Sequence, residues 1–159
     1  MESRRVTAFM ATGSRASRSD PRVSVAGYSG KPLIEKLGIK VGFRVSFVNA
    51  PSDYRALLGP LPQDVKALGT NARNLDLVHI FAKDTAQLIP ALPRAKARIR
   101  QNGTLWISWP KKSSAFHADL DENSVRELGL SNGLVDVKVA AIDDDWSGLK
   151  FVYRLKDRH

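Results

Sequence analysis

The stretch Leu75-Asp76-Leu77-Val78-His79-Ile80-Phe81-Ala82 is apolar at almost every position. A strand that faces the core on one side alternates apolar and polar residues, whereas a strand covered on both faces has a nearly continuous apolar run. This stretch therefore predicts a central strand between two layers of helices. The run Thr104-Leu105-Trp106-Ile107-Ser108-Trp109 has the same character and predicts a second buried strand, ended by Pro110.

Helical and strand patterns alternate before the central strand. A short helix is predicted from Pro32 to Gly38, because proline suits the first helical position and glycine suits the C-cap. The alternating run 43–48 predicts a strand, and a second short helix is expected at 53–58. The segment 61–74 is ambiguous, with a short strand near 65–68 as one interpretation.

After the central strand, a helical stretch is expected to begin at Asp84 or Thr85. The prolines at 90 and 93 predict a break, with a second helix over about 91–100 that stops at Asn102-Gly103. A further helix is predicted from Asp121 through Leu128. Two alternating strands, 135–142 and 149–155, then form a hairpin.

Strands that alternate with helices indicate a parallel sheet with helices on both faces. The predicted fold class is α/β: a single Rossmann-like three-layer domain over 27–159, with a mostly parallel sheet of about five strands and a C-terminal antiparallel hairpin. No internal repeat is apparent in the sequence.

Composition excludes several classes of protein. The chain has 159 residues, no cysteine and a formal net charge of +9. The lack of cysteine excludes disulfides, thiolate metal sites and cysteine nucleophiles. No apolar run approaches the ~20 residues that cross a bilayer, and the basic N-terminus lacks the apolar core of a secretory signal. We therefore expect a cytoplasmic protein without membrane contact, with no metal site and no assigned catalytic residue.

The positive charge is concentrated in two segments. Residues 1–26 carry five arginines and two acids, and residues 83–112 carry seven cations and one acid. The first segment is interpreted as a disordered basic tail or a start-site extension, with a nucleic-acid arm or a targeting peptide as alternatives. The second segment is consistent with a solvated helix face or with nucleic-acid binding, which is possible but not favoured.

The order of elements resembles the second half of a class I S-adenosylmethionine (SAM) methyltransferase. Residues 75–81 resemble the fourth strand of that fold, 103–109 the fifth, and 135–155 its terminal hairpin. A Rossmann cofactor site uses glycines after the first strand and an acid after the second. Here the first strand ends in Asn49-Ala50-Pro51-Ser52-Asp53, without glycine, and only 23 residues (52–74) precede the next clear strand. The sequence therefore predicts the architecture without a cofactor.

Three motifs carry a finer resemblance to a bacterial domain-of-unknown-function family. They are the Gly27-Tyr28-Ser29-Gly30 segment with Pro32-Leu33 and Lys36-Leu37-Gly38-Ile39, then Trp109-Pro110-Lys111-Lys112-x-Ser114, then Trp146-Ser147-Gly148-Leu149-x-Phe151-Val152. The resemblance covers about residues 27–155. It implies a fold and a start of the family region near Gly27, and it implies no activity.

Candidate ligand residues follow from the predicted sheet, because open α/β sheets bind ligands outside the carboxyl ends of their strands. The segments 49–53, 82–84, 109–114 and 143–148 are expected to meet at that edge. The predicted ligand-binding residues are Lys111, Lys112, Ser114, Trp146 and Asp144. The lysines suit a phosphate or carboxylate and the tryptophan a stacking wall, whereas the alternative is solvated lysines and core tryptophans.

Two histidines are weaker candidates. His79 lies in the central strand and is expected to be a hydrogen-bonded core residue, and nothing positions a nucleophile against His117. The expected function is a non-enzymatic module that binds an anionic small molecule or a protein partner at the strand-end edge. The alternatives are a divergent methyltransferase-like enzyme and a nucleic-acid-binding protein.

Overall fold

The structure is a computed structural model that describes residues 31–155. The predicted tail 1–26 and the predicted domain start at Gly27 lie outside the described residues. Over the described range, no helix combines the length and apolar character that a bilayer crossing requires.

A six-stranded sheet forms the centre of the described residues. The elements are α1 (Leu33–Leu37), β2 (Arg44–Val48), α2 (Tyr54–Leu58), β3 (Lys66–Ala67), β4 (Leu75–Phe81), α3 (Thr85–Arg98), β5 (Ile99–Pro110), α4 (Glu122–Ser131), β6 (Leu134–Ala141) and β7 (Trp146–Tyr153).

The strand order is β3-β2-β4-β5-β7-β6. The strands β3, β2, β4 and β5 pair in parallel, and β7 pairs antiparallel with both β5 and β6. This confirms the predicted α/β class and the terminal hairpin. The sheet has one strand more than the five predicted, because the ambiguous segment near 65–68 contributes the two-residue β3.

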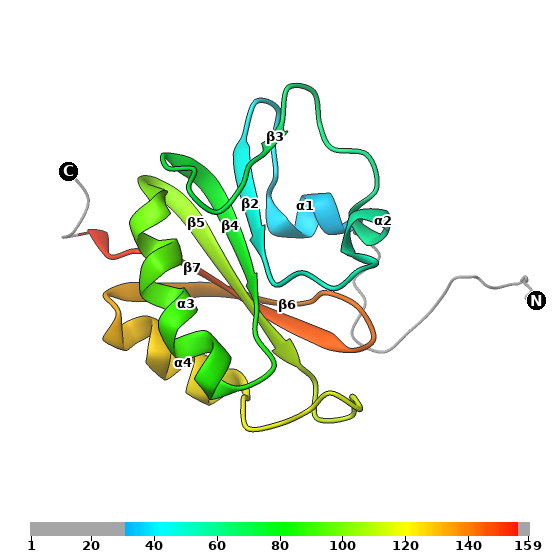
Figure 1. Cartoon of the computed structure of the whole chain (residues 1–159), viewed down its shortest axis with the longest axis vertical. Coiled ribbons are helices and arrows are strands. Elements are labelled where there is room, and N and C mark those ends of the chain that lie inside the picture. The colour runs from blue at the N-terminus through cyan, green and yellow to red at the C-terminus, as the bar shows by residue number, and fades with distance from the viewer. Residues whose placement is uncertain (1–30, 156–159) are drawn as a thin grey trace, which may run out of the picture. The chain divides into compact units, whose positions relative to one another are not determined.

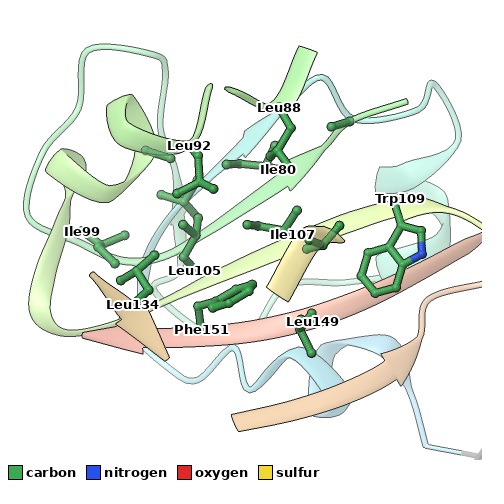
Figure 2. Close-up of a cluster of buried hydrophobic side chains, with 14 of the residues drawn as sticks. Ile80, Leu88, Leu92, Ile99, Leu105, Ile107, Trp109, Leu134, Leu149 and Phe151 are labelled. Carbon is green, nitrogen blue, oxygen red and sulfur yellow. The ribbon is translucent and has the colours of Figure 1, made fainter. Parts of the chain in front are cut away.

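Helices cover both faces of the sheet. Figure 1 shows α1 and α2 on one side of it and α3 and α4 on the other. The side with α3 and α4 holds the larger apolar cluster, in which Leu88 and Leu92 of α3 pack with strand residues such as Ile80 and Ile107 (Figure 2). The second cluster joins α1 and α2 to the opposite face through residues such as Phe81. The double coverage explains why β4 has a nearly continuous apolar sequence.

The predicted break at the two prolines is wrong. The helix α3 is continuous through Pro90 and Pro93, and it begins at the N-cap Asp84, whose side chain accepts a hydrogen bond from the Gln87 backbone N–H. Each proline removes a backbone donor from the helix. Its buried residues Leu88, Leu92 and Ala95 recur at helical spacing and pack on the sheet, so tertiary packing outweighs this local cost.

The predicted helix over 91–100 and its stop at Asn102-Gly103 are also wrong. The helix ends at Arg98, Ile99 already has extended backbone angles, and β5 runs through the Asn-Gly pair. A Cβ atom on Gly103 would lie 2.9 Å from the carbonyl oxygen of Leu75. The glycine therefore permits the close approach of β5 to the start of β4, where the register is irregular.

The sheet changes its winding direction between β2 and β4. From β2 the chain passes through α2 to β3 on one side, and then crosses back past β2 to form β4 on the other side. In open α/β sheets such a switch point leaves a crevice outside the carboxyl ends of the two strands. The site described below lies there.

Candidate ligand-binding site

A cavity of about 330 Å³ lies at the carboxyl ends of β2 and β4. We call it the strand-end cavity. Its lining comes from the loop after β2, the end of β4, the start of α3, the loop after β5 and the start of β7. The lining residues are Asn49, Ala50, Pro51, Ser52, Phe81, Lys83, Gln87, Phe116 and Trp146. Three of the four segments predicted to converge, 49–53, 82–84 and 143–148, contribute residues to this lining.

Aromatic side chains form the firm wall of this cavity. Phe81 and Trp146 are almost fully buried and meet edge to face, with ring centroids 5.1 Å apart. Phe116 is half exposed, and the Lys83 ammonium lies 5.3 Å from its ring centroid. Because two aromatic rings are held by the core and the third is exposed, the cavity offers a fixed apolar surface with one adjustable side chain.

The turn at 143–146 holds Trp146 in place. The Asp143 carboxylate accepts hydrogen bonds from the backbone N–H groups of Asp145 and Trp146, at 2.8 Å and 2.9 Å. Burial raises the pKa of Asp143 above its usual range, and these two hydrogen bonds oppose that shift. The carboxylate therefore has a positioning role in the hairpin, and its partners are backbone groups.

The loop after β2 makes a left-handed turn without glycine. Asn49 has φ +58°, a conformation that asparagine tolerates better than most residues with a side chain. The next three residues, Ala50, Pro51 and Ser52, carry short side chains and line the cavity. A bound ligand can therefore come close to this backbone, which is the role that glycines have in other Rossmann loops.

The predicted ligand-binding residues lie in two neighbouring loops. The backbone N–H of Lys111 donates to the carbonyl of Asp145 at 2.8 Å, which joins the loop after β5 to the hairpin turn. Lys112 and Asp144 are exposed beside it, and Ser114 is buried, with its hydroxyl accepting the Phe116 N–H. Of the five predicted residues, Trp146 lines the strand-end cavity. Ligand binding by all five stays a prediction.

Sequence reasoning missed Phe116 and Gln87 as lining residues. Lys83 lies in the predicted edge segment 82–84, although it was not among the predicted ligand-binding residues, and Gln87 lies in the first turn of α3. Phe116 lies in an irregular loop, which a hydrogen bond from the Thr85 N–H to Asp119 ties to the start of α3. Nothing in the local sequence indicates that contact.

His79 is a fully buried, hydrogen-bonded core residue, as predicted. Its Nδ1 lies 2.7 Å from the Tyr54 hydroxyl, and its Nε2 lies 2.6 Å from Ser108 Oγ. Burial lowers the pKa of His79 to about 3 and raises the pKa of Tyr54. The imidazole is therefore neutral near pH 7, and it has no access to a ligand.

Solved structures with the same fold include methyltransferases. A SAM-dependent methyltransferase from Aquifex aeolicus matches with TM-score 0.53 and 13% identity, over 75% of this chain and 86% of that chain. A candidate type 11 methyltransferase from Sulfolobus solfataricus matches with TM-score 0.55 and 14% identity, over 80% and 92%. A complex of DhpI with SAH matches with TM-score 0.54 and 9% identity, over 78% and 83%. At these identities the likeness establishes a methyltransferase-like Rossmann fold.

Neither a protein-family profile nor a curated protein matches the sequence. The expectation of a non-enzymatic module is nevertheless corrected, because the solved structures that share the fold include a SAM-dependent methyltransferase and a candidate type 11 methyltransferase, and another was determined with SAH. The comparison favours the methyltransferase-like alternative. Nucleic-acid binding through residues 83–112 stays a prediction.

Proposed function

We propose that this protein is a divergent methyltransferase-like enzyme that binds an S-adenosyl compound in the strand-end cavity. The observation that carries the proposal is the position of this cavity, outside the carboxyl ends of β2 and β4 at the switch point of the sheet. Its aromatic wall and the likeness of the fold to SAM-dependent methyltransferases support it.

The lining residues fit two parts of an S-adenosyl ligand. The aromatic rings of Phe81, Trp146 and Phe116 in the lining suit an adenine ring, since aromatic side chains stack on every base. The left-handed Asn49 and the short side chains of Ala50 and Ser52 permit close approach to the backbone. Lys83 is a cation in the lining and suits the carboxylate of the amino-acid part.

The ribose site departs from the usual pattern. Rossmann cofactor sites hold the ribose with an acid after the second strand, whereas β3 is followed here by Leu68-Gly69-Thr70. The lining of the strand-end cavity contains no carboxylate. The neutral side chains of Asn49, Ser52 and Gln87 are the groups available for the hydroxyls, so we expect weaker affinity than an acidic partner would give.

The chemistry that such a cofactor supplies is an electrophilic methyl group on a sulfonium. Bound in the strand-end cavity, the cofactor would supply this methyl group to a substrate atom with a free electron pair. The protein's own contribution, on this proposal, is to hold the ligand against the aromatic side chains of Trp146 and Phe81 and to exclude water there.

Calorimetric titration of S-adenosylhomocysteine into the full chain tests this function. We expect saturable binding at one site, and we expect Phe116→Ala to weaken it about fivefold, because an aromatic contact contributes roughly 1 kcal/mol. Phe116 is half exposed, so its removal leaves the core intact. Ile89→Ala is the matched control, since Ile89 is exposed on α3 and lies outside the lining. Absence of binding at millimolar ligand overturns the proposal.

The finer resemblance leads to two further parts of the proposal. We propose, from the motifs at 32–39, 109–114 and 146–152, that the chain belongs with the bacterial family named above. The exposed residues Lys112 and Asp144, with Lys111 and the buried Ser114, border the side of the site from which a substrate enters. The hydrogen bond between Lys111 and Asp145 supports this, because it places both loops beside Trp146.

A further inference from the structure

A second cavity, of about 390 Å³, lies between α3 and the connection from β3 to β4. We call it the crossover cavity. Connections between parallel strands usually need a dozen or more residues and carry a helix. Here the connection is residues 68–74 and has no helix, so the α3 side of β2 is incompletely covered. The lining residues are Val48, Asn49, Thr70, Gln87, Pro90, Ala91, Arg94, Ala95 and Arg98.

A buried guanidinium lies at one end of this cavity. Arg98 is 8% exposed, and its Nε donates to the carbonyl of Ala72 at 3.0 Å. Its Nη2 donates to the carbonyl of Gly69 at 2.6 Å and to Ser46 Oγ at 2.8 Å. All three acceptors are neutral, and Nη1 has no acceptor among residues 31–155. The charge is therefore fixed in place by the fold without an anion to balance it.

A second guanidinium lies one turn earlier on the same helix. Arg94 is exposed, and its spacing of four residues from Arg98 places both on one side of α3. The lining contains no acidic residue. Burial lowers the pKa of Arg98 and the nearby Arg73 lowers it further, so an anion in the cavity would stabilise the charged guanidinium.

The remaining lining is suited to the apolar part of a small organic molecule. Val48, Pro90, Ala91 and Ala95 form an apolar surface, and a cavity of 390 Å³ is larger than a single oxyanion needs. We propose that the crossover cavity binds a small organic molecule with an apolar body and a terminal oxyanion, phosphate or carboxylate, held by Arg94 and Arg98. Guanidinium groups match the geometry of both oxyanions.

The two cavities share Asn49 and Gln87, so their ligands would lie next to each other. The anionic molecule is therefore assigned as the substrate class of the enzyme. This substrate role rests on the proposed function, whereas binding of the anion does not depend on it. The two parts can be tested separately on the same protein.

Ligand-observed NMR with three probes of similar size tests the binding. We expect the full chain to bind phenyl phosphate or benzoate and to bind the neutral benzyl alcohol much more weakly, with the first two probes distinguishing phosphate from carboxylate. Arg94→Ala should weaken anion binding about fivefold, as loss of a partly exposed charge pair does, and Arg94→Glu should weaken it further. Added salt should weaken it too.

The matched control is Arg55→Ala, which removes an exposed arginine from α2 on the opposite face of the sheet and should leave anion binding unchanged. Equal binding of benzyl alcohol, or binding insensitive to Arg94→Glu, overturns the proposal. If phenyl phosphate binds and S-adenosylhomocysteine does not, the anion site stands and the proposed function fails. If S-adenosylhomocysteine binds and both anions fail, the proposed function stands and this site is wrong.

Discussion

Acidification from pH 6.5 to pH 4 is expected to lower the free energy of unfolding by about 3 kcal/mol through His79 alone. The pKa of this buried histidine is lowered from 6.5 to about 3. The unfolded chain binds a proton below about pH 6.5 at this position, and the folded protein does not until about pH 3. The unfolded state therefore binds more protons over this range. The contribution of His79 to the free energy of unfolding is fully present above pH 6.5 and is lost as the pH falls toward 3.

The geometry of the site explains why the folded protein resists the proton. His79 is fully buried between Tyr54 and Ser108, which satisfy both ring nitrogens of the neutral imidazole. No carboxylate contacts the ring in the described part of the chain. Burial would therefore destabilise a charged imidazolium, and no anion would compensate for the lost hydration.

Urea denaturation at pH 7, 5.5 and 4 measures this effect. His79→Gln removes the titrating group and should flatten the pH dependence, whereas His117→Gln changes an exposed histidine and should leave the slope as in the parent protein. NMR of the His79 imidazole in the parent protein provides a second readout, with the neutral ring expected to persist at pH 4.5. A ring that protonates near pH 6 contradicts the prediction.

Gly129→Ala is expected to destabilise the protein by about 2–3 kcal/mol, although alanine is the better helix former by about 1 kcal/mol. Gly129 is buried in α4 and faces the ring of Phe151, which is fully buried in β7. A Cβ atom at this position would lie within 2.7 Å of three atoms of that ring. Phe151 is surrounded by the larger core cluster (Figure 2), so the ring has no space into which it can move.

Thermal and urea unfolding of Gly129→Ala measure this cost. Glu127→Ala is the control, because Glu127 is exposed in the same helix and its replacement should change stability by less than about 0.5 kcal/mol. The double variant with Phe151→Leu should recover part of the loss, since the smaller side chain removes the ring. Unchanged stability of the single variant would show that α4 does not approach β7 so closely.

The fold was predictable where burial alone determines the pattern. The runs at 75–82 and 104–109 are apolar because helices cover them on both faces, and this pattern is local. The path through Pro90 was not predictable, because the packing of Leu88 and Leu92 on the sheet outweighs the proline penalty. Gly103 resembles a turn signal in sequence, whereas its role depends on a neighbouring strand.

The site was predictable only in outline. The rule that ligands bind at strand ends pointed to the edge where the strand-end cavity lies, and it included Trp146, which lines that cavity. The same rule favoured Lys111 and Lys112 because they follow the predicted strand 104–109. The crossover cavity was missed because it depends on a helix that the fold lacks. A guanidinium such as Arg98 appears in sequence as one more surface charge, and only its burial distinguishes it.

The position of β7 inside the sheet has a consequence for synthesis on the ribosome. This strand is the last of the described strands in the chain, yet it pairs on one side with β5 and on the other with β6. Until residues 146–153 leave the exit tunnel, β6 has no partner and both apolar clusters lack members. Nascent chains that stop before residue 146 should therefore remain protease-sensitive. The domain should complete its folding in one late step, after β7 has been synthesised.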